Sequence, residues 1–104
     1  MKTMEVTVVR IYLTEGEHKL PEFLKRLHDI EKVRGVTVFR GICGFGKSGM
    51  MHSSGLLDLS LDLPLVIEFF DAPDRVISIM SHLDDLIDPG HMLRWQAQLN
   101  TGSE

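Results

Sequence analysis

Residues 41–48 read GICGFGKS, which matches the phosphate-binding pattern G-x-x-x-x-G-K-S/T of nucleotide hydrolases and kinases. In that chemistry the amides of the glycine loop hold phosphate, the lysine neutralises it, and a helix begins directly after the loop. The next residues are GMMHSSGLLDLSLDLP, where glycine, serine and alternating leucine disfavour a helix. Asp71 ends a later apolar segment, as a Mg²⁺ ligand would, but no convincing helix lies between the two pieces. The pattern therefore does not predict a nucleotide hydrolase.

The same glycine-rich segment suits a simpler anion site. Glycines permit positive φ and close approach of the backbone, so that neighbouring amides can together bind an anion without any helix. The segment supplies four glycines and three side chains that carry charge or donate hydrogen bonds: Gly41, Gly44, Gly46, Gly49, Arg40, Lys47 and His52. These groups favour a phosphate-containing ligand over an apolar one.

Length and composition limit the class of protein. The chain has 104 residues, 43% hydrophobic and 25% charged, which predicts a single globular domain over residues 1–104. The net charge is −4 without a basic stripe, so nucleic acid is not an expected partner. The single cysteine, Cys43, excludes an intramolecular disulfide and fits a reducing cytoplasm. No apolar run reaches the roughly 18 residues of a membrane span.

Hydrophobic patterns predict four main strands and two helices. Strands are expected over residues 5–13, 36–42, 65–70 and 91–99 because these segments are rich in β-branched and aromatic residues or alternate in polarity. A first helix is expected from Leu20 to about Val33, with Gly35 as its C-terminal cap. A second is expected to open at residues 71–73 and to end at Pro89-Gly90, with an apolar stripe of Val76, Ile79, Met80, Leu83 and Ile87.

The order βαββαβ predicts a ferredoxin-like α+β fold, an antiparallel sheet with both helices on one face. The first and third main strands carry apolar residues at both parities: Val6, Val8, Tyr12, Val66 and Phe70 against Val9, Ile11, Leu13, Ile67 and Phe69. Two helices cover only one face, so the second face is expected to pack against another subunit. The alternative is a β-bulge near Val8 that shifts the parity.

The connection between the second and third main strands is much longer than a hairpin loop. It reads FGKSGMMHSSGLLDLSLD from residue 45, and the leucines from Leu57 to Leu63 alternate with Asp and Ser. That alternation is compatible with a short extra strand. The part of the connection that precedes this strand is then available to bind a ligand, since long loops in compact domains are commonly functional.

These residues resemble a known family. The segment RGICGFG, the later His52, the run LLDLSLDLPLVIEFFD and the two flanking helices are similar to an uncharacterised family of small PII-like proteins, over almost the whole chain. The resemblance implies a ferredoxin-like subunit that assembles as a homotrimer, with residues 45–63 in place of the PII signalling loop. The chain departs from PII proteins in that its only tyrosine is Tyr12, outside the loop.

PII proteins bind adenine nucleotides between subunits. The resemblance therefore implies AMP, ADP or ATP as ligand, held by the base of the loop, the turn after the second helix and the last strand. Transferred to this chain, the implied site consists of Arg40, Gly41, Gly44, Phe45, Gly46, Lys47, His52, Gly90 and Arg94. The implied function is that of a non-enzymatic regulator, in which the nucleotide orders the loop and so controls docking on a partner such as a transporter or an enzyme.

Other functions stay open at this stage. A metal- or anion-binding trimer that resembles copper-tolerance proteins would bring His52, His82 and His91 together with Asp88 or Cys43, although no regular metal-site spacing is present. No catalytic residues are predicted. Glu68 lies among apolar residues and needs a partner, for which Arg40, Arg94 or a ligand hydroxyl are the candidates.

Overall fold

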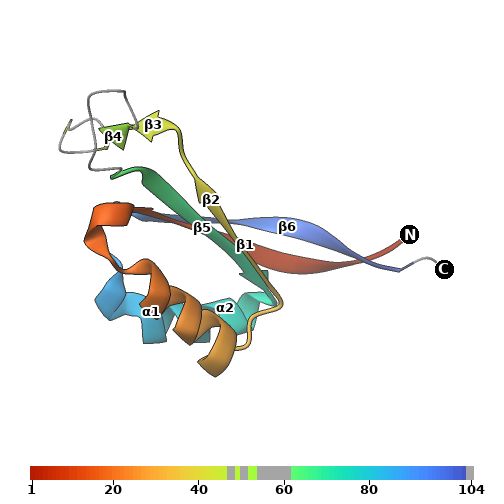
Figure 1. The fold of residues 1–104 in the computed structure, drawn as a ribbon. Helices are drawn as coiled ribbons and strands as arrows, with labels where there is room; N and C mark the ends of the chain where they lie inside the picture. Colours follow the sequence, from red (N-terminus) through yellow and green to blue (C-terminus); the bar gives the residue numbers. More distant parts are fainter. Residues whose placement is uncertain (47–48, 50–51, 54–61, 103–104) are drawn as a thin grey trace.

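The computed structural model describes residues 1–46, 49, 52–53 and 62–102 (Figure 1). The helices and strands are β1 (Lys2–Thr14), α1 (Leu20–Lys25), β2 (Gly35–Arg40), β3 (Cys43–Gly44), β4 (His52–Ser53), β5 (Pro64–Asp71), α2 (Pro73–Leu83) and β6 (Met92–Gly102). The main sheet is antiparallel with strand order β2-β5-β1-β6, while β3 and β4 form a separate two-stranded sheet. This order confirms the ferredoxin-like α+β fold.

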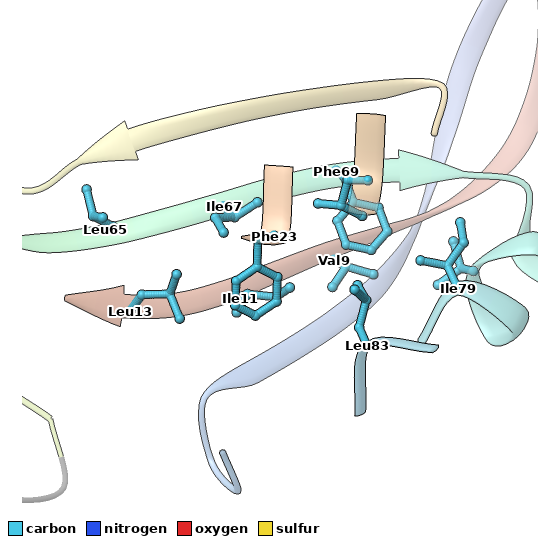
Figure 2. Packing of buried hydrophobic residues seen from close by; sticks show 11 residues of the cluster. Val9, Ile11, Leu13, Phe23, Leu65, Ile67, Phe69, Ile79 and Leu83 are labelled. Atoms are coloured by element: carbon cyan, nitrogen blue, oxygen red, sulfur yellow. The ribbon is translucent and has the colours of Figure 1, made fainter. Parts of the chain in front are cut away.

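The hydrophobic core lies between the sheet and the two helices. Alternate residues of β1 and β5 point toward the helices, among them Val9, Ile11 and Ile67, and all three are fully buried. Phe23 of α1 and Ile79 of α2 cover them from the other side (Figure 2). Two helices thus cover one face of the sheet, as the pattern predicts.

The first helix ends earlier than predicted. A single π-type turn, Arg26–Ile30, follows α1, and Lys32 takes a left-handed conformation with φ 51°. The Val33 amide then donates back to the Leu27 carbonyl at 3.0 Å, which closes the helix. Gly35 is therefore not the cap: it begins β2, where a Cβ atom would lie 2.7 Å from the Phe70 ring.

The second helix also ends earlier than predicted. It closes at Leu83, and a 3-10 turn, Asp84–Leu86, continues the chain. The guanidinium of Arg26 binds Asp85 through Nη1 to Oδ1 at 2.8 Å and Nη2 to Oδ2 at 3.2 Å, and donates to the His82 carbonyl at 3.0 Å. These bonds join the turns that follow the two helices, and they lower the pKa of Asp85. The predicted apolar stripe faces the core.

The strands differ from their predicted limits mainly at the ends. β1 and β6 are each longer than predicted and run together as a ribbon past the end of β5, so that both termini lie at one end of the molecule (Figure 1). β6 extends through Thr101 and Gly102, three residues beyond its predicted end at residue 99. β2 ends at Arg40, before the predicted residue 42.

The second face of the sheet carries apolar side chains and no described element covers it. Directly paired residues share a face, and the register pairs Val8 with Phe70 and Trp95, and Tyr12 with Val66. The irregularity in β1 lies between Lys2 and Thr3, so the predicted alternative of a bulge near Val8 is wrong. We call this surface the open face; it contains Val8, Arg10, Tyr12, Phe39, Val66, Glu68, Phe70, Leu93 and Trp95.

Two sequence predictions concern the long connection and the membrane. The short strand predicted from Leu57 to Leu63 lies, apart from its last residues, outside the described part of the chain. Among the described helices, none is long and apolar enough to cross a membrane.

Candidate ligand site at the base of the loop

The glycine-rich segment forms a hairpin at the end of the sheet opposite the termini (Figure 1). After β2 the chain enters β3, which pairs with β4 through Cys43–Ser53 and Gly44–His52. The Gly49 amide donates to the Gly46 carbonyl at 2.9 Å and closes a turn at the tip. The segment therefore leads from strand to strand, whereas the strand-loop-helix geometry of the hydrolase pattern requires a helix.

Both ends of the connection are anchored on the 3-10 turn that follows β1, Glu15–Glu17. On the outgoing side, Glu15 forms an ion pair with Arg40. On the returning side, the Glu15 amide donates to the Leu63 carbonyl at 2.9 Å and the Gly16 amide to Asp62 Oδ1 at 2.6 Å. The turn thus contacts residues on either side of the hairpin, and we call it the anchoring turn.

A close contact between the two ends of the connection explains one of the glycines. The Gly41 amide donates to the Pro64 carbonyl at 2.7 Å. A Cβ atom on Gly41 would lie 2.7 Å from Pro64 Cγ, so only glycine fits without a shift. The amides of Gly41 and Gly49 are thus both used in backbone hydrogen bonds and are not available to an anion.

Arg40 does not lie free beside the glycines. Its Nε donates to Glu15 Oε1, and this hydrogen bond raises the pKa of the guanidinium further above its ordinary value. The Arg40 side chain is 60% exposed and that of Glu15 is 23% exposed, so the pair lies at the surface. Pairing with an acid across the sheet is the alternative to a ligand role for Arg40.

Gly90 and Arg94 lie at the other edge of the same sheet. Gly90 has φ 83° in the turn before β6, where a left-handed conformation favours glycine. Arg94 is paired with Val9 of β1 and is exposed. With strand order β2-β5-β1-β6, three inter-strand spacings separate β6 from Arg40 on β2, roughly 14 Å. One subunit therefore does not bring these two groups of predicted residues together.

The remaining predicted residues lie on the hairpin. Phe45 is exposed at its tip and Gly46 has no neighbouring atom within 4 Å of a Cβ position. His52 lies in β4, and Lys47 falls outside the described residues. Among the described residues, no group of three or more His, Cys, Asp or Glu side chains could hold a metal ion.

The partner of Glu68 is Arg10, which was not among the predicted candidates. Arg10, its direct neighbour across β1 and β5, donates from Nε to Glu68 Oε1 at 2.7 Å, and the guanidinium lies 5.5 Å from the centroid of the Trp95 ring. Neither Arg40 nor Arg94 is the partner, because the strand register places both on the helix side of the sheet. Glu68 lies on the open face. The signal was present as an arginine inside an apolar strand.

Comparisons with solved structures show the fold. The PII-like protein CPII from Thiomonas intermedia K12, in a structure bound to ADP and bicarbonate, superposes with TM-score 0.68 at 24% identity and covers 94% of this chain and 91% of its own. A putative PII-like signaling protein from Thermus thermophilus superposes with TM-score 0.57 at 19% identity, with coverage of 95% and 91%. At these identities the likeness establishes the fold, which is PII-like.

The family follows from sequence comparison. The sequence model of the DUF190 family (Uncharacterized ACR, COG1993) matches residues 6–99, and the chain belongs to this family. UPF0166 proteins are related: one from Aquifex aeolicus is 32% identical over 77 residues, covering 74% of this chain and 78% of its own. One from Methanocaldococcus jannaschii is 31% identical over 88 residues, covering 81% of each chain. The predicted resemblance to an uncharacterised PII-like family is confirmed.

Proposed function

We propose that this protein is a non-enzymatic PII-like regulator that binds an adenine nucleotide at the boundary between subunits of a homotrimer. The observation that carries the proposal is a glycine-rich hairpin anchored at one end of a PII-like sheet, with Phe45 and Gly46 exposed at its tip. Support comes from CPII, which has structures bound to ADP and to both ADP and AMP. A cytoplasmic location is part of the proposal, and it is compatible with an adenine nucleotide as ligand.

The hairpin would supply the phosphate-binding groups. In the proposal the Gly44 and Gly46 amides and Lys47 hold phosphate, His52 donates a hydrogen bond, and Phe45 stacks on the base. Arg40 adds charge once its guanidinium turns toward the ligand. Gly41 keeps the base of the hairpin against Pro64, because its amide and its missing side chain both serve that contact.

A neighbouring subunit would complete the site. Gly90 and Arg94 lie about three strands from Arg40 within one chain, so their proposed role requires that they reach the nucleotide from the adjacent copy. The open face supports self-association, because its apolar side chains lack a covering layer among the described residues and a stable domain buries such a surface. A nucleotide between copies would then set the position of the hairpin that a transporter or enzyme contacts.

Calorimetric titration of the purified protein with AMP, ADP and ATP, each with and without Mg²⁺, tests the proposal. We expect binding at about one site per subunit. Lys47→Ala should weaken it at least about tenfold through loss of a charge-assisted hydrogen bond. Lys25→Ala is the matched control, since Lys25 is exposed on α1, away from the hairpin. No heat with any nucleotide, or equal affinity of the two variants, would refute the proposal.

A further inference from the structure

A cavity of about 460 Å³ lies on the helix side of the sheet, away from the open face. It is bounded by the anchoring turn, the start of α1 and the ends of β2 and β5. Its lining consists of Glu15, His18, Leu20, Pro21, Val38, Arg40 and Leu65. This volume falls in the range of about 300–1,000 Å³ that is typical of small-molecule sites. The cavity is open to solvent and has room for a small molecule.

The lining divides into an apolar floor and a charged rim. Leu20, Val38 and Leu65 form the floor, and all three belong to the hydrophobic core or pack against it. The rim carries the ion pair of Glu15 and Arg40. The Glu15 carboxylate would repel a purely anionic ligand, and the Arg40 guanidinium would repel a purely cationic ligand. The rim therefore favours a ligand that carries both charges side by side.

We infer that this cavity binds a free α-amino acid with an apolar side chain. Its ammonium group binds the Glu15 carboxylate, its carboxylate binds the Arg40 guanidinium, and its side chain covers the apolar floor. An α-amino acid suits the rim because its two charged groups flank a single carbon, as the two charges of the rim lie in contact. The existing ion pair uses the Nε–H of Arg40, and a guanidinium has five N–H donors, so a ligand carboxylate can bind without breaking the pair.

The same residues connect the cavity to the hairpin. Glu15 belongs to the anchoring turn, whose amides hold Leu63 and Asp62, and Arg40 directly precedes Gly41. An amino acid in the cavity therefore contacts the residues that anchor both ends of the connection. In conjunction with the proposed nucleotide site, which shares Arg40, the amino acid should weaken nucleotide binding and the nucleotide should weaken amino acid binding by the same factor.

Titration of the nucleotide-free, isotope-labelled protein with leucine and phenylalanine, followed by amide chemical shifts, tests the inference. We expect saturable changes at Gly16, Val38 and Leu65, and none at Val8 on the open face. Isocaproate, which is leucine without its amine, and isoamylamine, which is leucine without its carboxylate, should bind at least about tenfold more weakly. No saturable change in the cavity, or equal binding of leucine and these analogues, would overturn the inference.

A charge-removing variant tests the role of Glu15. Glu15→Gln should weaken leucine binding by about tenfold and abolish the preference for leucine over isocaproate. Asp84→Asn, the same chemical change at an exposed carboxylate outside the cavity, should leave both properties unchanged. Unaltered selectivity in Glu15→Gln contradicts the inference. Because no nucleotide is present, the outcome does not depend on the nucleotide proposal, and a failed nucleotide titration leaves it standing.

Discussion

At the scale of single residues, the ion pair of Arg10 and Glu68 sets the character of the open face. The pair lies among apolar side chains, and Arg10 also contacts the Trp95 ring. The hydrogen bond to Glu68 raises the pKa of Arg10, so the guanidinium stays charged at neutral pH. An interface that buries the open face would remove the pair from water, which makes each charge dependent on the other.

Arg10→Met should weaken self-association by about thirtyfold or more, because Glu68 would be buried in the interface without its partner. Glu68→Leu should have a similar effect through Arg10. The double variant should associate at least as tightly as the wild-type protein, since apolar residues can replace a buried ion pair without loss. Sedimentation equilibrium measures all three. Single variants that associate like the wild-type protein would show that the pair lies outside the interface.

Gly41 and Gly46 lie close in sequence but differ in their surroundings. Gly41→Ala should lower the free energy of unfolding by about 1–3 kcal/mol, because its Cβ would overlap the Pro64 ring and disturb the base of the hairpin. Gly46→Ala should change it by less than about 0.5 kcal/mol, since no atom lies within 4 Å of that Cβ position. Urea unfolding measures both, and equal midpoints would contradict this account of Gly41.

At the scale of elements, each helix contributes one apolar stripe and the anchoring turn links the hairpin to the sheet. α2 illustrates the first point, because its buried residues recur at helical spacing while their neighbours face outward. The anchoring turn illustrates the second, since it has no buried residue and acts through its amides and the Glu15 carboxylate. The helices therefore contribute to the hydrophobic core, whereas the three-residue turn contributes contacts to the ends of the loop.

Two isoleucines of α2 test that division. Ile79 is 1% exposed and Ile77 is 65% exposed on the opposite side of the same helix. Ile79→Ala should lower the free energy of unfolding by about 2–5 kcal/mol through lost burial and a residual cavity. Ile77→Ala should change it by less than about 0.5 kcal/mol. The midpoints of urea unfolding report the difference; similar losses would mean that the outer surface of α2 is also buried in the assembly.

At the scale of the whole molecule, the subunit has two layers, the sheet and the pair of helices. A third layer would be needed to cover both faces of the sheet. Tyr12, Phe39, Leu93 and Trp95 all remain exposed on the open face. The paired charges of Arg10 and Glu68 leave this face without a net charge, which is compatible with a second copy of the same surface. Self-association is thus the proposal that accounts for both features.

Trp95, the single tryptophan, reports on this face. It is 39% exposed in the isolated subunit, so dilution of an assembly should shift its emission to the red as the sedimenting mass falls from three subunits to one. Leu93→Asp should give the red-shifted emission at every concentration and retain the far-ultraviolet circular dichroism of a folded subunit, because Leu93 lies outside the core. A single-subunit mass at all concentrations of the wild-type protein would refute self-association.

Much of the fold could be predicted because the relevant signals are local. The alternation in β1 and β5 and the helical spacing in α2 depend on residues that are neighbours in sequence, and they identify the core correctly. The end of the first helix could not be predicted, because it depends on the left-handed Lys32 and on contacts of Gly35 with Phe70, which is distant in sequence. For the candidate site, the glycines could be identified from the sequence, but the structural role of each glycine could not.

By itself, the sequence determined the order of the elements, the apolar character of both sheet faces and the family, because composition, periodicity and motif similarity are properties of the chain. Only the tertiary structure decided which charges meet. Arg10 pairs with Glu68 and Arg40 with Glu15 because the strand register and the anchoring turn bring together residues that lie 58 and 25 positions apart. Ion pairs and cavities depend on distances in space, and a single sequence does not contain those distances.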